Sequence, residues 1–135
     1  MGLLTERYDM DFKAITYETI NNTTNTYATT LAVDMKDANR VVFACNVVSM
    51  GGGTVVWTVE ESATTADGDF AGTALTAYTT THTQASGHAD TWRTIEVPAS
   101  AMTATKRYLR LKATASAHAQ IITAIAIRDM VYSNI

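Results

Sequence analysis

The sequence predicts an all-β domain built as a β-sandwich or jelly roll. Runs of β-branched and aromatic residues alternate with a period of two, as side chains do along a strand. Clusters of Gly, Asn, Asp and Thr separate these runs at short intervals, and no stretch of ordinary helix length is convincing. About seven or eight such strands are typical of a sandwich or jelly roll, with an open barrel as the chief alternative.

The composition indicates one domain with a weakly charged surface. The chain has 135 residues, near the usual size of one domain. Charged residues make up 17% of it, below the roughly 25% typical of soluble domains, and threonine is its commonest residue. The surface should therefore carry many hydroxyl and methyl groups, which suits a protein packed against others and equally an ordinary soluble β protein.

Charge and hydropathy exclude two classes of partner. The net charge is −3 and the basic residues form no single run, which argues against nucleic acid. No segment reaches the roughly 20 apolar residues that span a bilayer, and residues 1–7 lack the order of a signal peptide. We therefore expect no membrane partner, and synthesis and assembly in the host cytoplasm. Cys45, the single cysteine, lies in an apolar run and is predicted to be a buried free thiol.

The N-terminal part differs from the rest. Residues 1–30 are polar and rich in Thr, Asn and Tyr, which favour turns and extended chain. We predict an extended arm here, with a short strand over residues 12–19, and a sandwich domain over residues 31–135. A disordered terminus is the alternative to the arm.

The first predicted strands surround a glycine-rich turn. Residues 31–35 alternate, and residues 41–49 are apolar on both faces, as in a central strand. Gly51, Gly52 and Gly53 then predict a hairpin into a strand over residues 54–61.

The second half predicts further strands and one long loop. Residues 62–72 read as a loop, residues 75–78 as a short strand, and residues 79–90 as a long exposed loop. A strand over residues 92–97 ends at Pro98, a helical turn follows within 99–104, and further strands cover 105–114 and 120–132. A helix over residues 113–127 is the alternative, but its isoleucines favour a strand.

A search for catalytic or metal-binding groups finds weak signals. His82, His88 and Asp90 share one predicted loop and are a conceivable metal set, although their spacing is not diagnostic. Asp67-Gly68-Asp69 resembles part of a calcium loop but lacks the later ligands, so a tight turn is preferred. Glu60 and Glu61 are adjacent in a strand and should point to opposite faces, which rules out an acid–base pair. The glycines at 51–53 precede a strand rather than the helix that a phosphate loop needs. We therefore expect no enzyme, no cofactor and no metal.

Aromatic residues offer a second kind of site. Trp57 alternates with valines and is predicted to lie in the core. Trp92 begins a strand beside the long loop and, with Tyr78 and Tyr108, is a candidate platform for stacking on a sugar.

Several segments resemble a family of tailed-bacteriophage capsid decoration, or cement, proteins. They are the strand at 41–49, Trp57-Thr58-Val59-Glu60-Glu61-Ser62, Asp67-Gly68, the run from Thr105 to Leu111 containing Lys106-Arg107-Tyr108-Leu109-Arg110, and the isoleucine-rich C-terminal strand. The resemblance covers roughly residues 31–132, and residues 79–90 and the N-terminal region depart from it. It implies a jelly-roll subunit, commonly a homotrimer, on the outer surface of the virion, where it clamps neighbouring major capsid proteins.

We consider three functions and one set of contact residues. The first function is the structural capsid subunit; the second is a tail or baseplate adhesin or carbohydrate-binding module, favoured by Trp92; the third is an enzyme of unknown class. A basic face on residues 107–112 could meet acidic capsid surface or simply be solvated, and the arm could pair with a neighbour by strand addition. The candidate partner contacts are Tyr17, Tyr27, His82, His88, Trp92, Arg107, Arg110 and Lys112.

Overall fold

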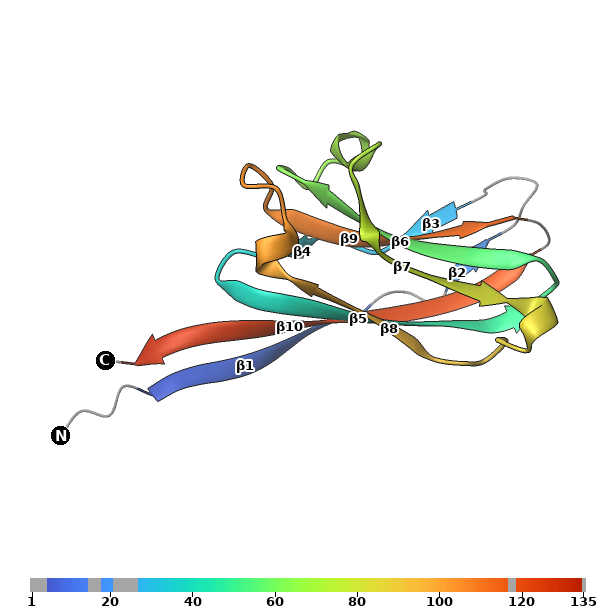
Figure 1. Cartoon of the computed structure of the whole chain (residues 1–135), viewed down its shortest axis with the longest axis horizontal. Helices are drawn as coiled ribbons and strands as arrows, with labels where there is room; N and C mark the ends of the chain where they lie inside the picture. The colour runs from blue at the N-terminus through green and yellow to red at the C-terminus, as the bar shows by residue number, and fades with distance from the viewer. Residues whose placement is uncertain (1–4, 15–17, 21–26, 117–118, 135) are drawn as a thin grey trace.

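Strands make up nearly all of the regular structure (Figure 1). The computed structural model describes residues 5–14, 18–20, 27–116 and 119–134. The strands are β1 (Thr5–Ala14), β2 (Glu18–Ile20), β3 (Tyr27–Thr29), β4 (Val33–Asp34), β5 (Ala38–Met50), β6 (Thr54–Ser62), β7 (Ala74–Thr83), β8 (Arg93–Pro98), β9 (Tyr108–Ala115) and β10 (Gln120–Asn134). Short 3-10 turns occur at η1 (Asp67–Phe70), η2 (Gln84–Ser86) and η3 (Ala99–Ala101). The predicted all-β fold is confirmed.

The strand order is that of a jelly roll. One antiparallel sheet runs β1–β10–β5–β8, with β2 also beside β10, and the other runs β3–β9–β6–β7, with β4 also beside β9. β1 and β2 take the same side of β10, and β3 and β4 the same side of β9, so each pair acts as one interrupted strand. Counted this way, each sheet has four strands, and their order is that of an eight-stranded jelly roll.

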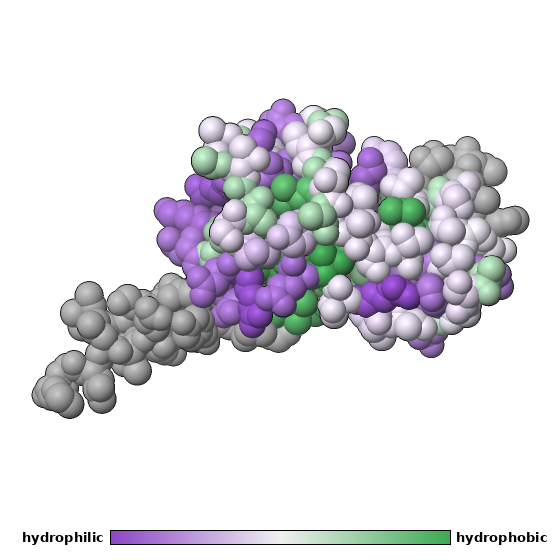
Figure 2. All heavy atoms as spheres, in the orientation of Figure 1, coloured by the Kyte–Doolittle hydropathy of each residue, from purple (hydrophilic) through white to green (hydrophobic). Residues whose placement is uncertain are grey.

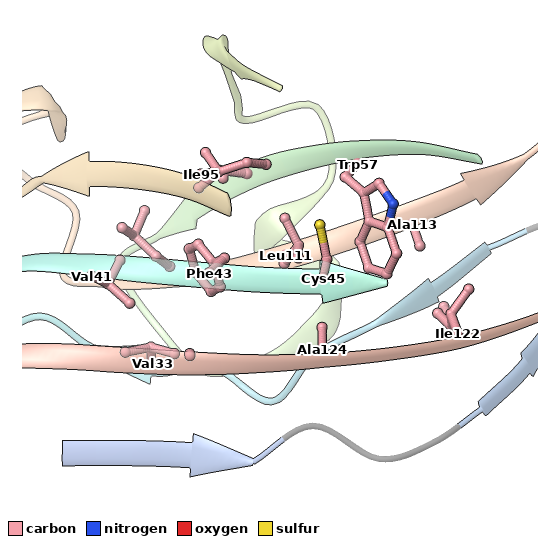
Figure 3. Packing of buried hydrophobic residues seen from close by; sticks show 14 of the residues in the cluster. Val33, Val41, Phe43, Cys45, Trp57, Ile95, Leu111, Ala113, Ile122 and Ala124 are labelled. Carbon is pink, nitrogen blue, oxygen red and sulfur yellow. The ribbon is translucent and has the colours of Figure 1, made fainter. Parts of the chain in front are cut away.

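The core lies between the two sheets, where alternate apolar side chains of β5, β6 and β9 point inward (Figure 3). Phe43 of β5 and Trp57 of β6 are among its largest members. Cys45 is also fully buried, and burial raises the pKa of its thiol to about 12. The predictions of a buried thiol and of a core position for Trp57 are confirmed.

The predicted glycine hairpin is wrong. β5 pairs with β10 and β8, whereas β6 pairs with β9 and β7, so the three glycines carry the chain from one sheet to the other. Gly52 and Gly53 have φ of 137° and 69°, which only glycine adopts easily. Both strands have apolar inward faces, and they meet face to face across the core rather than edge to edge.

The predicted long loop at 79–90 is also wrong in its first half. Thr79–Thr83 belong to β7 and pair with Thr54–Thr58 of β6. Threonine fits a strand as well as a loop, so the threonine-rich run gave no clear alternation of apolar and polar residues. The strand predicted over 120–132 is confirmed as β10, and the helical turn after Pro98 as η3.

Residues 1–30 contribute strands where the structure describes them. β1 and β2 join the first sheet and β3 joins the second. β1 pairs with β10 as far as Thr5 and Asn134, whereas the pairing of β5 with β10 stops at Ala38 and Met130. The two strands therefore leave the sandwich together as a two-stranded ribbon (Figure 1). Tyr17 lies outside the described residues.

Candidate interaction site

A buried histidine fixes the loop that joins β7 to β8, residues 84–92. His82 is on β7 and fully buried. The indole N–H of Trp57 donates to Nδ1 of His82 across 3.0 Å. Nε2 of His82 lies 2.6 Å from the carbonyl oxygen of Thr91. Because Nδ1 accepts, the proton is on Nε2 and is donated to Thr91. Burial lowers the pKa of His82, which keeps this neutral form.

Further hydrogen bonds hold the same loop to both sheets. The side-chain amide of Asn46 on β5 donates to the Asp90 carboxylate across 3.0 Å. The Asp90 N–H donates to the Val47 carbonyl across 2.8 Å, and Asp90 has a φ of 54°. Nδ1 of His88 accepts from the backbone N–H of Thr83 across 3.1 Å. Residues 84–90, the second half of the predicted loop, therefore do form a loop, and hydrogen bonds hold it to both sheets.

Trp92 is the last residue of this loop and is exposed to solvent. It follows Thr91, whose carbonyl is bound by His82, and precedes Arg93, the first residue of β8. Its side chain is exposed to 55%. The guanidinium of Arg93 donates to the Thr80 hydroxyl across 3.4 Å, so it links β8 to β7. The structure thus brings His82 and His88 together, with ring centres 6.4 Å apart, His82 buried and His88 half-buried, while Trp92 is exposed next to Thr91, which His82 binds.

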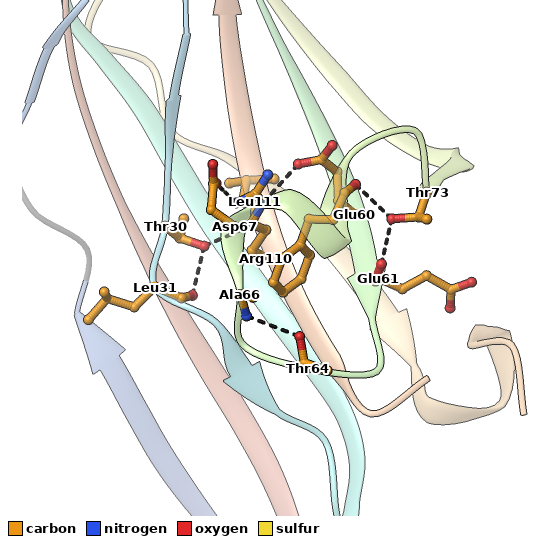
Figure 4. Close-up of polar contacts among 11 residues, drawn as sticks. Thr30, Leu31, Glu60, Glu61, Thr64, Ala66, Asp67, Thr73, Arg110 and Leu111 are labelled. Atoms are coloured by element: carbon orange, nitrogen blue, oxygen red, sulfur yellow. Dashed lines mark hydrogen bonds and ion pairs between the residues drawn. The ribbon is translucent and has the colours of Figure 1, made fainter. Parts of the chain in front are cut away.

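The predicted open basic face on β9 does not exist, because Arg110 is buried (Figure 4). Its Nε donates to Glu60 across 2.9 Å, and its Nη1 pairs with Asp67 of η1. The guanidinium lies 4.4 Å from the centre of the Phe70 ring. The turn η1 therefore covers Arg110, and its charge is balanced within the protein.

The other two predicted cations have partners as well. Arg107 makes a two-pronged contact with the Asp34 carboxylate at 2.9 and 2.7 Å, which lowers the pKa of Asp34 to about 2. Lys112 lies with its ammonium 4.5 Å from the centre of the Tyr27 ring, and Tyr27 is 44% exposed. Tyr27 and Lys112 thus form one exposed pair on the outer side of the second sheet.

Comparison with solved structures finds several that are similar to this chain. The PBSX exported protein XepA superposes with a TM-score of 0.60 at 12% identity, covering 93% of this chain and 39% of that protein. A family 11 carbohydrate-binding module from Clostridium thermocellum, in complex with a β-1,3-1,4-mixed-linked tetrasaccharide, gives a TM-score of 0.44 at 13% identity, covering 96% and 90%. A chain of infectious bursal disease virus Gx strain gives 0.44 at 11%, covering 93% and 32%.

The likeness to XepA shows the jelly-roll fold. The chain spans 39% of the length of that protein. The sequence itself matches no family model and no curated protein.

The carboxylates and histidines raised as catalytic or metal candidates are engaged in the fold. Glu60 pairs with Arg110, whereas Glu61 accepts the backbone N–H of Thr103 across 2.9 Å, so the two carboxylates bind different partners. Both ring nitrogens of His82 are used. Within residues 5–14, 18–20, 27–116 and 119–134, no three His, Cys, Asp or Glu residues are grouped as metal ligands would be. No helix of that described part is long and apolar enough to cross a membrane.

Two surface features were not predicted from the sequence. Leu31, between β3 and β4, is 77% exposed, although alternation placed it in a half-buried strand. A groove of about 380 Å³ lies beside η3, and the strand pattern gave no sign of it because its walls come from separate segments. Its lining residues are Met35, Lys36, Ala99, Met102, Thr103, Ala104, Lys106 and Arg107.

Proposed function

We propose that this chain is a structural virion protein of a tailed bacteriophage, a decoration or cement subunit that binds across neighbouring major capsid proteins on the outer surface of the head. The observation that carries the proposal is the presentation of Trp92. This large side chain is 55% exposed, yet the loop beneath it is fixed by buried hydrogen bonds of His82 and Asn46. A rigid exposed aromatic residue loses little conformational entropy on binding and is the usual centre of a protein interface.

The phage assignment draws on the fold and on the sequence resemblance. The chain shares its jelly roll with the PBSX exported protein, which supports a phage origin. The segments that resemble decoration proteins occupy the body of the sandwich: β5, β6, η1, β9 and β10. A cement subunit stabilises a shell by burying surface across joints, through mass action and without a chemical step. The proposal therefore assigns no catalytic residue, cofactor or metal.

The homotrimer that we propose uses the exposed apolar residues as its subunit contacts. Tyr27 and Leu31 are on the β3–β4 edge of the second sheet, and Trp92 is beside β8, the edge strand of the first sheet. β2 lies against β3 and β7 against β8, so these two edges are on opposite sides of the sandwich. A contact between two different patches repeats around a ring when the rotation between subunits closes, and a homotrimer is one such ring. We propose that Trp92 of one subunit packs against the Tyr27–Leu31 edge of the next.

Binding to heads tests the proposal. Heads of the phage that encodes the chain are prepared without it, mixed with the purified protein and sedimented. We expect saturable binding at a fixed ratio to the major capsid protein, and heads that withstand heating or chelation better once they are coated. Protein that stays in the supernatant at concentrations well above micromolar would contradict the proposal.

Trp92 also supports a second candidate, a glycan-binding module. Exposed indole rings stack on sugar rings, and Asp90 lies two residues away and is exposed. A glycan array with the wild-type chain and Trp92→Ala separates the two functions. Specific glycan binding that is lost in Trp92→Ala, with no binding to heads, favours the module; an array without signal favours the capsid subunit.

A further inference from the structure

The groove beside η3 has an apolar floor. Met35, Ala99 and Met102 line it, and Met35 is 6% exposed while the other two are partly buried against the core. Methionine side chains adapt their shape to different apolar partners and are frequent at peptide-binding surfaces. The volume, about 380 Å³, is enough for one or two side chains of a partner.

The groove has a cationic rim in a protein of net negative charge. Lys36, Lys106 and Arg107 line it, while the whole chain carries a net charge of −3. Arg107 is already paired with Asp34, whose pKa of about 2 keeps the carboxylate charged. Asp37, the other nearby carboxylate, interacts with Arg107 as well.

The two lysines remain available. The structure gives the ammonium groups of Lys36 and Lys106 no carboxylate within ion-pair distance among the residues it describes. Both therefore offer a positive charge to whatever enters the groove. An occupant that satisfies the groove needs an apolar side chain for the floor and carboxylates for the rim.

A second hollow also has a residue of η3 in its wall. It has a volume of about 260 Å³ and is formed by residues 74–78 of β7 with Ala101 of η3. Here β7 leaves the ladder with β6, because the pairing passes from Thr58–Thr79 directly to Glu60–Ala74. Figure 2 shows apolar residues gathered in the middle of this face with hydrophilic residues beside them. Residues 99–102 contribute to the walls of both hollows, and an extended segment can reach both where a compact ligand cannot.

We propose that this groove binds an extended acidic segment of a partner protein, with an aliphatic side chain over Met35 and Met102 and carboxylates at Lys36 and Lys106. The proposal rests on the proposed function, since it identifies the segment as one carried by the capsid partner. It gives the capsid partner a contact separate from the subunit contact proposed for Trp92, and it uses the charges of Lys36 and Lys106.

A peptide titration tests the groove independently of any capsid. The probe is a fluorescein-labelled Asp-Glu-Leu-Asp-Glu peptide, compared with a version in which Ser replaces Leu and with an Asn-Gln-Leu-Asn-Gln version. The matched variants are Lys106→Glu, in the groove, and Lys112→Glu, on the outer side of the second sheet beside Tyr27. We expect both changed peptides and Lys106→Glu to weaken binding about tenfold or more, and Lys112→Glu to change it less than about twofold.

Other outcomes overturn the proposal. No binding of the acidic peptide to the wild-type protein would do so, as would equal loss in the two lysine variants, which indicates unspecific charge attraction. Equal binding of the serine version together with displacement by millimolar inorganic phosphate would reveal a simple anion site instead.

Head binding by Lys106→Glu separates this proposal from the proposed function. Lys112→Glu is left out of this comparison, because Lys112 lies against Tyr27, which the proposed subunit contact uses. If wild-type protein binds heads and Lys106→Glu binds more weakly, the groove is part of the capsid contact. If Lys106→Glu binds as the wild type does, the capsid function stands and the groove proposal fails. If even the wild type does not bind heads, the proposed function fails, while the peptide titration still decides whether the groove takes acidic segments.

Discussion

Trp57 and His82 are joined by a hydrogen bond inside the sandwich, with the indole N–H 3.0 Å from Nδ1 and the rings set edge to face at 66°. Trp57 lies on β6, an inner strand of the second sheet. The other ring nitrogen of His82, Nε2, donates to the carbonyl oxygen of Thr91, the residue before Trp92. The orientation of an exposed tryptophan therefore depends on a polar contact in the core.

Replacing the buried histidine should cost substantial stability. His82→Leu keeps the volume but leaves the Trp57 N–H and the Thr91 carbonyl without partners, at about 1–3 kcal/mol for each buried group. We expect a loss of about 3 kcal/mol in the free energy of unfolding, measured by urea denaturation. His88→Gln, at a half-buried position in the same loop, is the control and should cost about 1 kcal/mol or less. If both variants lose the same free energy of unfolding, the hydrogen bonds of His82 to Trp57 and Thr91 stabilise the protein no more than the contacts of His88 do.

The same histidine should make stability depend on pH. Burial lowers the pKa of His82 below its ordinary 6.5, so between 6.5 and the lowered value the unfolded chain binds a proton that the folded chain does not. The free energy of unfolding should therefore be largest above pH 6.5 and fall as the pH drops through this window, by up to about 1.4 kcal/mol per pH unit. Urea titrations between pH 7.5 and 4.5 measure the slope.

His82→Gln is the control for the pH profile. The part of the slope due to His82 should vanish in this variant. Asp34 does not confuse the comparison, because its pKa of about 2 shifts its own loss of stability to between pH 3.8 and 2. A slope as steep in His82→Gln as in the wild type contradicts the assignment.

Removing only one residue of the buried ion pair between Glu60 and Arg110 should destabilise the protein more than removing both. Arg110→Met leaves the Glu60 carboxylate buried without its partner, and we expect a loss of about 3 kcal/mol by urea denaturation. Glu60→Leu combined with Arg110→Met should recover most of that loss, because neither charge then stays buried. Asp67→Asn should change stability by less than about 0.5 kcal/mol, since Asp67 is 75% exposed. A double variant no more stable than Arg110→Met would contradict this account.

Trp92 should affect association and leave folding unchanged. Its side chain is 55% exposed, so Trp92→Ala should alter the free energy of unfolding by no more than about 0.5 kcal/mol. In sedimentation equilibrium, self-association should weaken about tenfold or more, as expected for an interface anchor. Thr94→Ala, exposed on β8, is the matched control and should leave association as it is. Unchanged association in Trp92→Ala would remove this residue from the subunit contact.

The sequence was informative where one local pattern determines one structure. Alternating valines around Trp57 identified a strand and its buried face, and the isoleucines of β10 favoured a strand over a helix. The all-β fold follows from many such segments. The glycines at 51–53 did not determine the pairing, because a hairpin and a crossing between sheets need the same tight, positive-φ turn.

The site depended on contacts between distant segments. Nothing in the threonine-rich run around His82 distinguishes a buried imidazole from an exposed one, since the partners Trp57 and Thr91 lie elsewhere in the chain. Arg110 read as part of a basic face because its partner Glu60 is 50 positions away. The place of Trp92 beside a loop made it a candidate contact residue. The structure shows that it is exposed, but only the fold reveals what holds that loop.

The composition of the purified virion tests the central claim most directly. Gradient-purified particles of the phage that encodes the chain are analysed by quantitative mass spectrometry, with infected-cell extract as the reference for synthesis. We predict that the chain is present in the particles at a fixed ratio to the major capsid protein and is removed by proteolysis that leaves the shell intact. Particles that lack the chain, although infected cells contain it, would contradict the account.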